Sequence, residues 1–220
     1  MVFLHAGSGS CEMWEHQIPA FTAAGYRFLA LERRAEGSAV DDLEAFAGHL
    51  GLDRFHLVGT AAGGIVALDY ALTHPERLRT VVIANSILGV QDEEYVEMAR
   101  RLRPAPEFNA IPAEIRELGP AYRATNAAGT QRWKELAREG HPVAQTAKNR
   151  ITFAALKTIK TPTLLITGDA DLYTPPPVLR LFAERFPDCE SVVIPECGHS
   201  AFWEQPDVFN RTVLDFITGK

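Results

Sequence analysis

The sequence has few of the features that are typical of membrane, secreted or nucleic-acid-binding proteins. Its apolar runs all fall short of the roughly 18 residues needed to cross a bilayer, and no basic segment followed by an apolar one forms a secretory signal. Lysine and arginine are scattered, and the formal net charge is −6, whereas nucleic-acid binding requires a basic face. We therefore expect neither a membrane nor a nucleic acid as a partner.

Cysteine is scarce as well. Cys11, Cys189 and Cys197 are an odd number without C-x-x-C spacing, which argues against a disulfide framework and against structural zinc. We expect a cytoplasmic protein without a metal site. The hydrophobic fraction of 46% is that of an ordinary globular chain, and 220 residues fit one large domain or a core with an insertion.

Short β-branched runs alternate with amphipathic helices, a pattern typical of an α/β fold with a mostly parallel sheet. We expect about six strands, at residues 2–5, 27–32, 55–59, 80–85, 163–167 and 191–195. Their almost unbroken apolar character predicts burial on both faces. Between them we expect three helices: at 38–50, from the end of the strand at 55–59 to about His74, and from about Pro206 to Ile217. Ser38-x-x-Asp41 is a capping box at the start of the first.

Residues 88–156 break this alternation. They contain several helical segments interrupted by proline and glycine, and no convincing strand. We interpret the chain as a core formed by residues 1–87 and 157–220, with 88–156 as a helical cap over one end of the sheet.

The segment HLVGTAAGG at 56–64 is a buried strand that enters a turn of small residues and then a helix. This is the context of the nucleophile elbow G-x-S-x-G, in which the sharp turn leaves no room for side chains two residues before and after its apex. Gly59 and Gly63 occupy the two glycine positions, but the apex is Ala61, which has no nucleophilic atom. Thr60 precedes the apex and is no obvious substitute.

Three further segments follow predicted strands. His5-Ala6-Gly7-Ser8-Gly9-Ser10 is a turn of small residues whose N–H groups could stabilise an oxyanion. Asp171 lies three residues after Gly168, with Asp169 as the competing carboxylate. His199 lies 28 residues beyond Asp171, before the final helix. The order elbow, acid, histidine is that of a hydrolase triad.

With these motifs the chain resembles the α/β-hydrolase superfamily, in its esterase, lactonase and carbon–carbon hydrolase branch. Gly198-His199-x-x-x-x-Glu204-x-Pro206 and Gly168-x-x-Asp171-x-x-x-Pro175 carry the resemblance, which spans essentially the whole chain. It implies a hydrolase of an ester, lactone or related carbonyl compound, with a small-molecule substrate and no cofactor.

The resemblance also implies residue roles. His199 would be the general base, oriented by Asp171, and the N–H groups of Gly7 and Ala62 would form the oxyanion hole. A tentative substrate pocket would include the side chains of Ser8, Trp14, Tyr95, Tyr122 and Trp133. The aromatic side chains could equally pack in the core, because aromatic residues at helical spacing usually point inward.

Ala61 leaves three interpretations open. In the first, the chain is a Ser→Ala variant of a serine hydrolase. In the second, Ala61 is natural and His199 and Asp171 act directly as a general base, as in hydrolysis by water or in lyases and cofactor-free oxygenases. In the third, the protein binds a small molecule without turnover. The retained acid and histidine count against the third interpretation.

The N-terminus is a second departure from the family pattern. Family members usually have two further strands before the one that ends in the His-Gly loop, whereas Met1 stands at that strand here. The strand at 27–32 would then be a sheet edge, which invites pairing, and a homodimer is one way to cover it. The alternative is that the natural chain is longer.

Overall fold

The strands lie parallel in a single sheet. The structure is a computed structural model that describes residues 1–140 and 145–220. The strands are β1 (Val2–Leu4), β2 (Leu29–Leu31), β3 (Phe55–Thr60), β4 (Leu78–Ala84), β5 (Thr163–Gly168) and β6 (Cys189–Ile194). Their order is β2-β1-β3-β4-β5-β6, and each adjacent pair is parallel. The predicted fold class and strands are confirmed, and β2 lies at an edge as expected.

Successive residues of the inner strands feed two separate cores, because side chains of a strand alternate between the faces of a sheet. In β3, Leu57 packs into one core and Val58 into the other. Burial on both faces is confirmed for these inner strands, but it is wrong for the edges. Most of β6 is partly or fully exposed and β2 is only half-buried, since each has a neighbouring strand on one side only.

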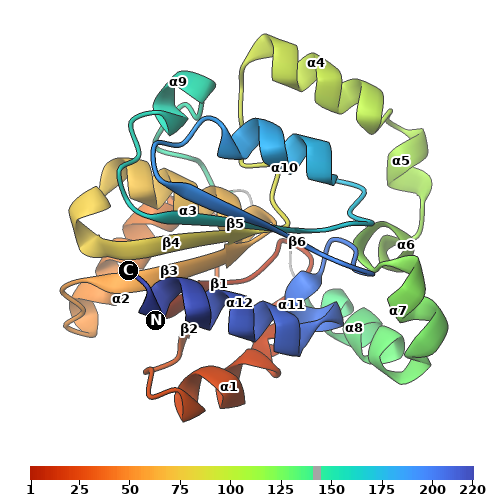
Figure 1. Ribbon diagram of the computed structural model, residues 1–220, viewed down its shortest axis with the longest axis horizontal. Coiled ribbons are helices and arrows are strands. Elements are labelled where there is room, and N and C mark those ends of the chain that lie inside the picture. The colour runs from red at the N-terminus through yellow and green to blue at the C-terminus, as the bar shows by residue number, and fades with distance from the viewer. Residues whose placement is uncertain (141–144) are drawn as a thin grey trace.

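Helices cover both faces of the sheet (Figure 1). One core packs against α2 (Ala39–His49), α3 (Ala62–Thr73) and α10 (Pro176–Ala183). The other packs against α1 (Gln17–Ala23), α11 (Ala201–Glu204) and α12 (Pro206–Thr218). Short 3-10 helices precede α1 and β4, at η1 (Cys11–Trp14) and η2 (Pro75–Arg77). The predicted start of the helix at Ser38 is confirmed, because Ser38 Oγ accepts a hydrogen bond from Asp41 N at 3.2 Å, which is one half of the capping box.

The described part of the segment between β4 and β5 is helical, as predicted. It contains α4 (Glu93–Leu102), α5 (Glu107–Ala110), α6 (Ala113–Glu117), α7 (Pro120–Thr125), α8 (Ala127–Glu139) and α9 (Phe153–Leu156). Figure 1 shows α6, α7 and α8 beyond the end of the sheet toward which the strands point, and α4 above α10. Leu136 of α8 packs into the core beside α12, and Leu156 of α9 packs into the core beside α3. The division into core and cap stays a prediction.

No helix in residues 1–140 and 145–220 is both long enough and apolar enough to span a membrane.

Candidate active site

The turn between β3 and α3 has the geometry of an elbow. Ala61 stands at its apex with φ 49° and ψ −114°, a conformation that side chains rarely adopt and that costs roughly 1–3 kcal/mol. The flanking glycines are required by space. A Cβ on Gly59 would lie 2.3 Å from the carbonyl oxygen of Gly63, and one on Gly63 would lie 2.2 Å from that of Leu4. The surrounding strands therefore hold Ala61 in this strained position.

Two loops at the same edge of the sheet bring an acid and a histidine together. Asp171 follows β5 and His199 follows β6, and His199 Nδ1 lies 2.9 Å from both carboxylate oxygens of Asp171. Both side chains are buried. The competing carboxylate, Asp169, instead accepts a hydrogen bond from the backbone N–H of Cys197 at 3.1 Å.

Opposing effects determine the ionisation of this pair. Burial alone would raise the pKa of Asp171, but the neighbouring His199 and hydrogen bonds from Thr174 and Asn85 lower that pKa to about 2. Burial alone would lower the pKa of His199, but the Asp171 carboxylate outweighs it and the net pKa is raised. The carboxylate thus stays ionised and favours a proton on the imidazole.

A cavity of about 220 Å³ lies where the elbow, the histidine and the first loop meet. Its lining residues are Gly7, Ser8, Ala61, Ala62, Ile65, Ile87, Glu117, Tyr173 and His199. A Cβ on Gly7 would lie 3.5 Å from that of Ala62, so the first loop runs directly beside the start of α3. Within the described chain, the N–H groups of Gly7 and Ala62 have no hydrogen-bond acceptor. Both are available to an oxygen atom in the cavity.

Asn85 was not singled out from the sequence, yet it contacts both catalytic loops. Its Nδ2 donates to Asp171 Oδ2 and to the Gly198 carbonyl, each at 3.1 Å, and its Oδ1 accepts from the N–H of Ala201 at 3.2 Å. The available signal was a buried amide directly after an apolar strand. Glu117, Tyr173, Ile65 and Ile87 in the cavity wall were missed too, and of these Ile65 and Tyr173 lie in or next to predicted motifs.

Four aromatic side chains expected to line the pocket lie elsewhere. Trp14 and Trp133 are fully buried in the core beneath α12, where the Trp14 ring lies 4.9 Å from that of Phe202. Tyr122 lines a different hollow, beside Glu204. Tyr95 packs against Phe182 at 5.1 Å between ring centres. Their apolar surface is used for packing between helices and sheet.

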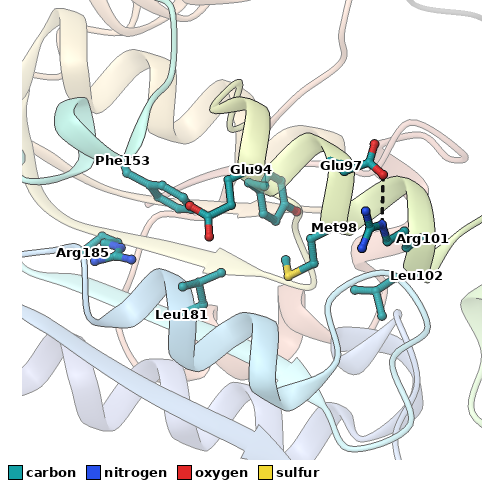
Figure 2. Close-up of a pocket in the computed structure, with 9 residues that line it drawn as sticks. Glu94, Glu97, Met98, Arg101, Leu102, Phe153, Leu181 and Arg185 are labelled. Carbon is teal, nitrogen blue, oxygen red and sulfur yellow. Dashed lines mark hydrogen bonds and ion pairs between the residues drawn. The ribbon is translucent and has the colours of Figure 1, made fainter.

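Tyr95 belongs to the wall of a larger cavity, of about 510 Å³, between α4 and α10. Figure 2 shows Met98 and Leu102 of α4 facing Leu181 of α10, with Arg185 at one end. None of the nine residues that line the active-site cavity takes part in it.

The nearby hydroxyl groups do not replace the missing serine. Ser86 Oγ donates to the Ala61 carbonyl at 2.7 Å, and Ser86 does not line the cavity. The Thr60 hydroxyl is buried and does not line the cavity. Ser8 lines the cavity, but no hydrogen bond joins it to His199 in residues 1–140 and 145–220. Over the same residues, no cluster of His, Cys, Asp or Glu could hold a metal ion.

The family model described as "Alpha/beta hydrolase family" matches residues 1–212. A 2-hydroxy-6-oxo-6-phenylhexa-2,4-dienoate hydrolase of Burkholderia cepacia is 25% identical, over all of this chain and 87% of the relative.

Solved structures share the fold. A thermophilic esterase from Thermogutta terrifontis superposes with a TM-score of 0.83 at 23% identity, over 99% of this chain and 89% of the other. An enol-lactonase from Burkholderia xenovorans LB400 gives a TM-score of 0.76 at 21% identity, over 99% and 90%. The match of the family model over nearly the whole chain shows that the protein belongs to the alpha/beta hydrolase family.

Proposed function

We propose that this chain is a hydrolase of an ester, lactone or related carbonyl compound, with His199 as its general base. The observation that carries the proposal is the 2.9 Å contact of His199 Nδ1 with both oxygens of Asp171, beside a cavity that Ala61 also lines. Asp171 holds the proton on Nδ1, which leaves Nε2 to accept one. Nε2 has no hydrogen-bond partner in the described part of the chain.

The substrate carbonyl has a binding place in the same cavity. Its oxygen would accept hydrogen bonds from the N–H groups of Gly7 and Ala62, which strengthen as that oxygen becomes negative. Ile65 and Ile87 provide an apolar wall for the acyl or leaving group. A neutral or weakly polar carbonyl compound suits these walls.

Water is the attacking group in the chain as written, because Ala61 has no oxygen or sulfur. The water oxygen bonds to the carbonyl carbon while its proton passes to His199 Nε2. As the tetrahedral intermediate collapses, the bond to the leaving oxygen breaks and His199 returns the proton to it. Without a covalent nucleophile this route is slow, on the order of a million-fold slower than in a serine enzyme.

The relatives support hydrolysis as the reaction class. The Burkholderia cepacia protein is named as a 2-hydroxy-6-oxo-6-phenylhexa-2,4-dienoate hydrolase, and the two solved relatives as an esterase and an enol-lactonase. These names leave the substrate of this chain open.

Binding without turnover is the second candidate function, and Ala61 is the observation that favours it. Against it, the turn keeps its strained apex and the base keeps its carboxylate, and a site used only for binding requires neither.

A panel of short-chain esters and lactones tests the proposal with three proteins: the chain as written, His199→Ala and Ala61→Ser. We expect slow turnover by the first, none by His199→Ala, and an increase of several orders of magnitude in Ala61→Ser. Unchanged activity in His199→Ala would exclude the imidazole as the base. A folded Ala61→Ser that binds these compounds but never hydrolyses them would favour a binding protein.

A further inference from the structure

Glu117 places a negative charge near His199, in the wall of the active-site cavity. It is the last residue of α6 and lines the cavity together with His199 and Tyr173. Apart from His199, which is positively charged when protonated, it is the one lining residue of the acidic or basic types, within the part of the chain that the structure describes. A bound substrate must therefore accommodate a negative charge at this wall.

Hydrogen bonds hold Glu117 beside the catalytic histidine. Its backbone carbonyl accepts from the N–H of His199 at 2.8 Å, and its Oε1 accepts from the Tyr173 hydroxyl at 3.1 Å. The Tyr173 ring lies over the imidazole, with 4.2 Å between ring centres. Oε2 accepts no hydrogen bond from any described residue, which leaves it available to a ligand.

The guanidinium groups of Arg103 and Arg116 form hydrogen bonds outside the cavity. Arg116 donates to the Tyr173 hydroxyl at 2.8 Å and to the Ile111 carbonyl at 3.0 Å. Arg103 donates to the Tyr173 carbonyl at 2.7 Å. Neither arginine lines the cavity, and Asp171 is buried behind His199. A ligand in the cavity thus meets a carboxylate oxygen and no guanidinium group.

We propose that Glu117 is a specificity-determining residue that selects substrates carrying an ammonium group and rejects those carrying a carboxylate. This inference rests on the proposed function, because it concerns the substrate of the same cavity. An ammonium group at this wall would meet Glu117 Oε2, whose negative charge attracts a cation. A carboxylate beside Glu117 would face a like charge.

Three esters of similar size separate charge from shape. Acetylcholine carries an ammonium group, 3,3-dimethylbutyl acetate is its uncharged carbon isostere, and monoethyl succinate carries a carboxylate. Because Ala61 slows turnover, their dissociation constants can be measured by titration calorimetry on the chain as written. We expect acetylcholine to bind about tenfold more tightly than its isostere at low salt, and monoethyl succinate to bind most weakly.

Two matched substitutions on α6 assign the effect. Glu117→Gln removes the charge and keeps an oxygen for the Tyr173 hydroxyl, and we expect it to bring the ratio of the two acetate esters close to one. Glu114→Gln removes a charge that pairs with Lys134 at 2.7 Å and does not line the cavity, so the ratio should not change. A purely structural role of Glu117 would weaken all three esters equally.

The outcomes distinguish the two proposals. A ratio that is unchanged in Glu117→Gln, with all three esters still bound, would overturn the role of Glu117 and leave the hydrolase proposal intact. No binding of any of the three, combined with no hydrolysis by Ala61→Ser, would overturn both.

Discussion

The imidazole of His199 must lose a proton before it can act as a base, and the raised pKa makes that loss occur at higher pH. Its pKa lies above the ordinary 6.5 because the charge of Asp171 favours the protonated form. The neutral, active form therefore accumulates only as pH rises through that raised value. We expect turnover by Ala61→Ser to increase with pH, with a midpoint above 6.5.

Asp171→Asn removes the charge, so the midpoint should move to lower pH while kcat falls by about 10⁴-fold, because the tautomer is no longer held. Asp169→Asn is the control, because Asp169 does not contact His199. An unchanged midpoint in Asp171→Asn would contradict the assignment of the acid. The measurement is the pH profile of kcat for the three proteins.

Asn85 forms hydrogen bonds to Asp171 and to the loop that carries His199. Asn85→Ala would leave the buried Gly198 carbonyl and Ala201 N–H without this partner, at a cost of about 1–3 kcal/mol in the free energy of unfolding. Since Asn85 has φ 48°, part of any loss in the alanine variant is backbone strain. Asn85→Gly removes the same side chain without that strain, and urea unfolding of both isolates the side-chain contribution. Stability equal to the parent in Asn85→Gly would contradict the account.

At the scale of elements, the elbow depends on close contact between β1, β3 and α3. Gly63→Ala would place a Cβ 2.2 Å from the backbone oxygen of Leu4, so α3 would have to move away from β1. We expect a loss of more than about 2 kcal/mol in the free energy of unfolding. Gly48→Ala is the matched control, because a Cβ at this position would contact nothing. Gly48 lies inside α2, where replacing glycine by alanine increases the free energy of unfolding by about 0.5–1 kcal/mol. Thermal unfolding should move in opposite directions for the two variants.

Glu204 of α11 joins the cap segment to the histidine loop. Its carboxylate accepts from the N–H groups of Gly119 at 2.6 Å, Gly198 at 3.0 Å and Ser200 at 3.2 Å. Burial raises its pKa to about 7, although these N–H groups act in the opposite direction. Folding therefore favours the protonated form. Its contribution to stability is full below pH 4.5 and declines as pH rises through about 7.

A comparison with Glu204→Gln isolates this titration. The free energy of unfolding of the parent, relative to the variant, should fall between pH 5 and pH 8 by an amount on the order of 3 kcal/mol. Urea unfolding at both pH values measures it, and Glu94→Gln, on the exposed side of α4, should show no such trend. A difference that rises with pH would contradict the assigned direction.

For the whole molecule, local signals in the sequence predicted the sheet and the three positions, Ala61, Asp171 and His199, that meet at the candidate site. Apolar runs indicate buried strands, and the paired glycines around Ala61 indicate the tight turn, so each can be recognised within a few residues. The same holds for Asp171 and His199, because loops after parallel strands meet at one edge of the sheet.

The cavity wall could not be predicted in this way. Glu117 and Asn85 reach the site from segments far from both catalytic loops, and no local pattern distinguishes them from surface or core polar residues. Trp14 and Trp133 failed as pocket residues because helical spacing is the same for a side chain that packs and for one that lines a pocket. Tertiary packing decides between the two.

We propose that the elbow, His199 and Asp171 form a hydrolase site that lacks one oxygen atom. Intact-mass measurement of Ala61→Ser after exposure to a serine-reactive phosphonate tests it most directly. We expect one adduct per chain, located at position 61, and none in the chain as written or in the double variant with His199→Ala. A folded Ala61→Ser that remains unlabelled would contradict it.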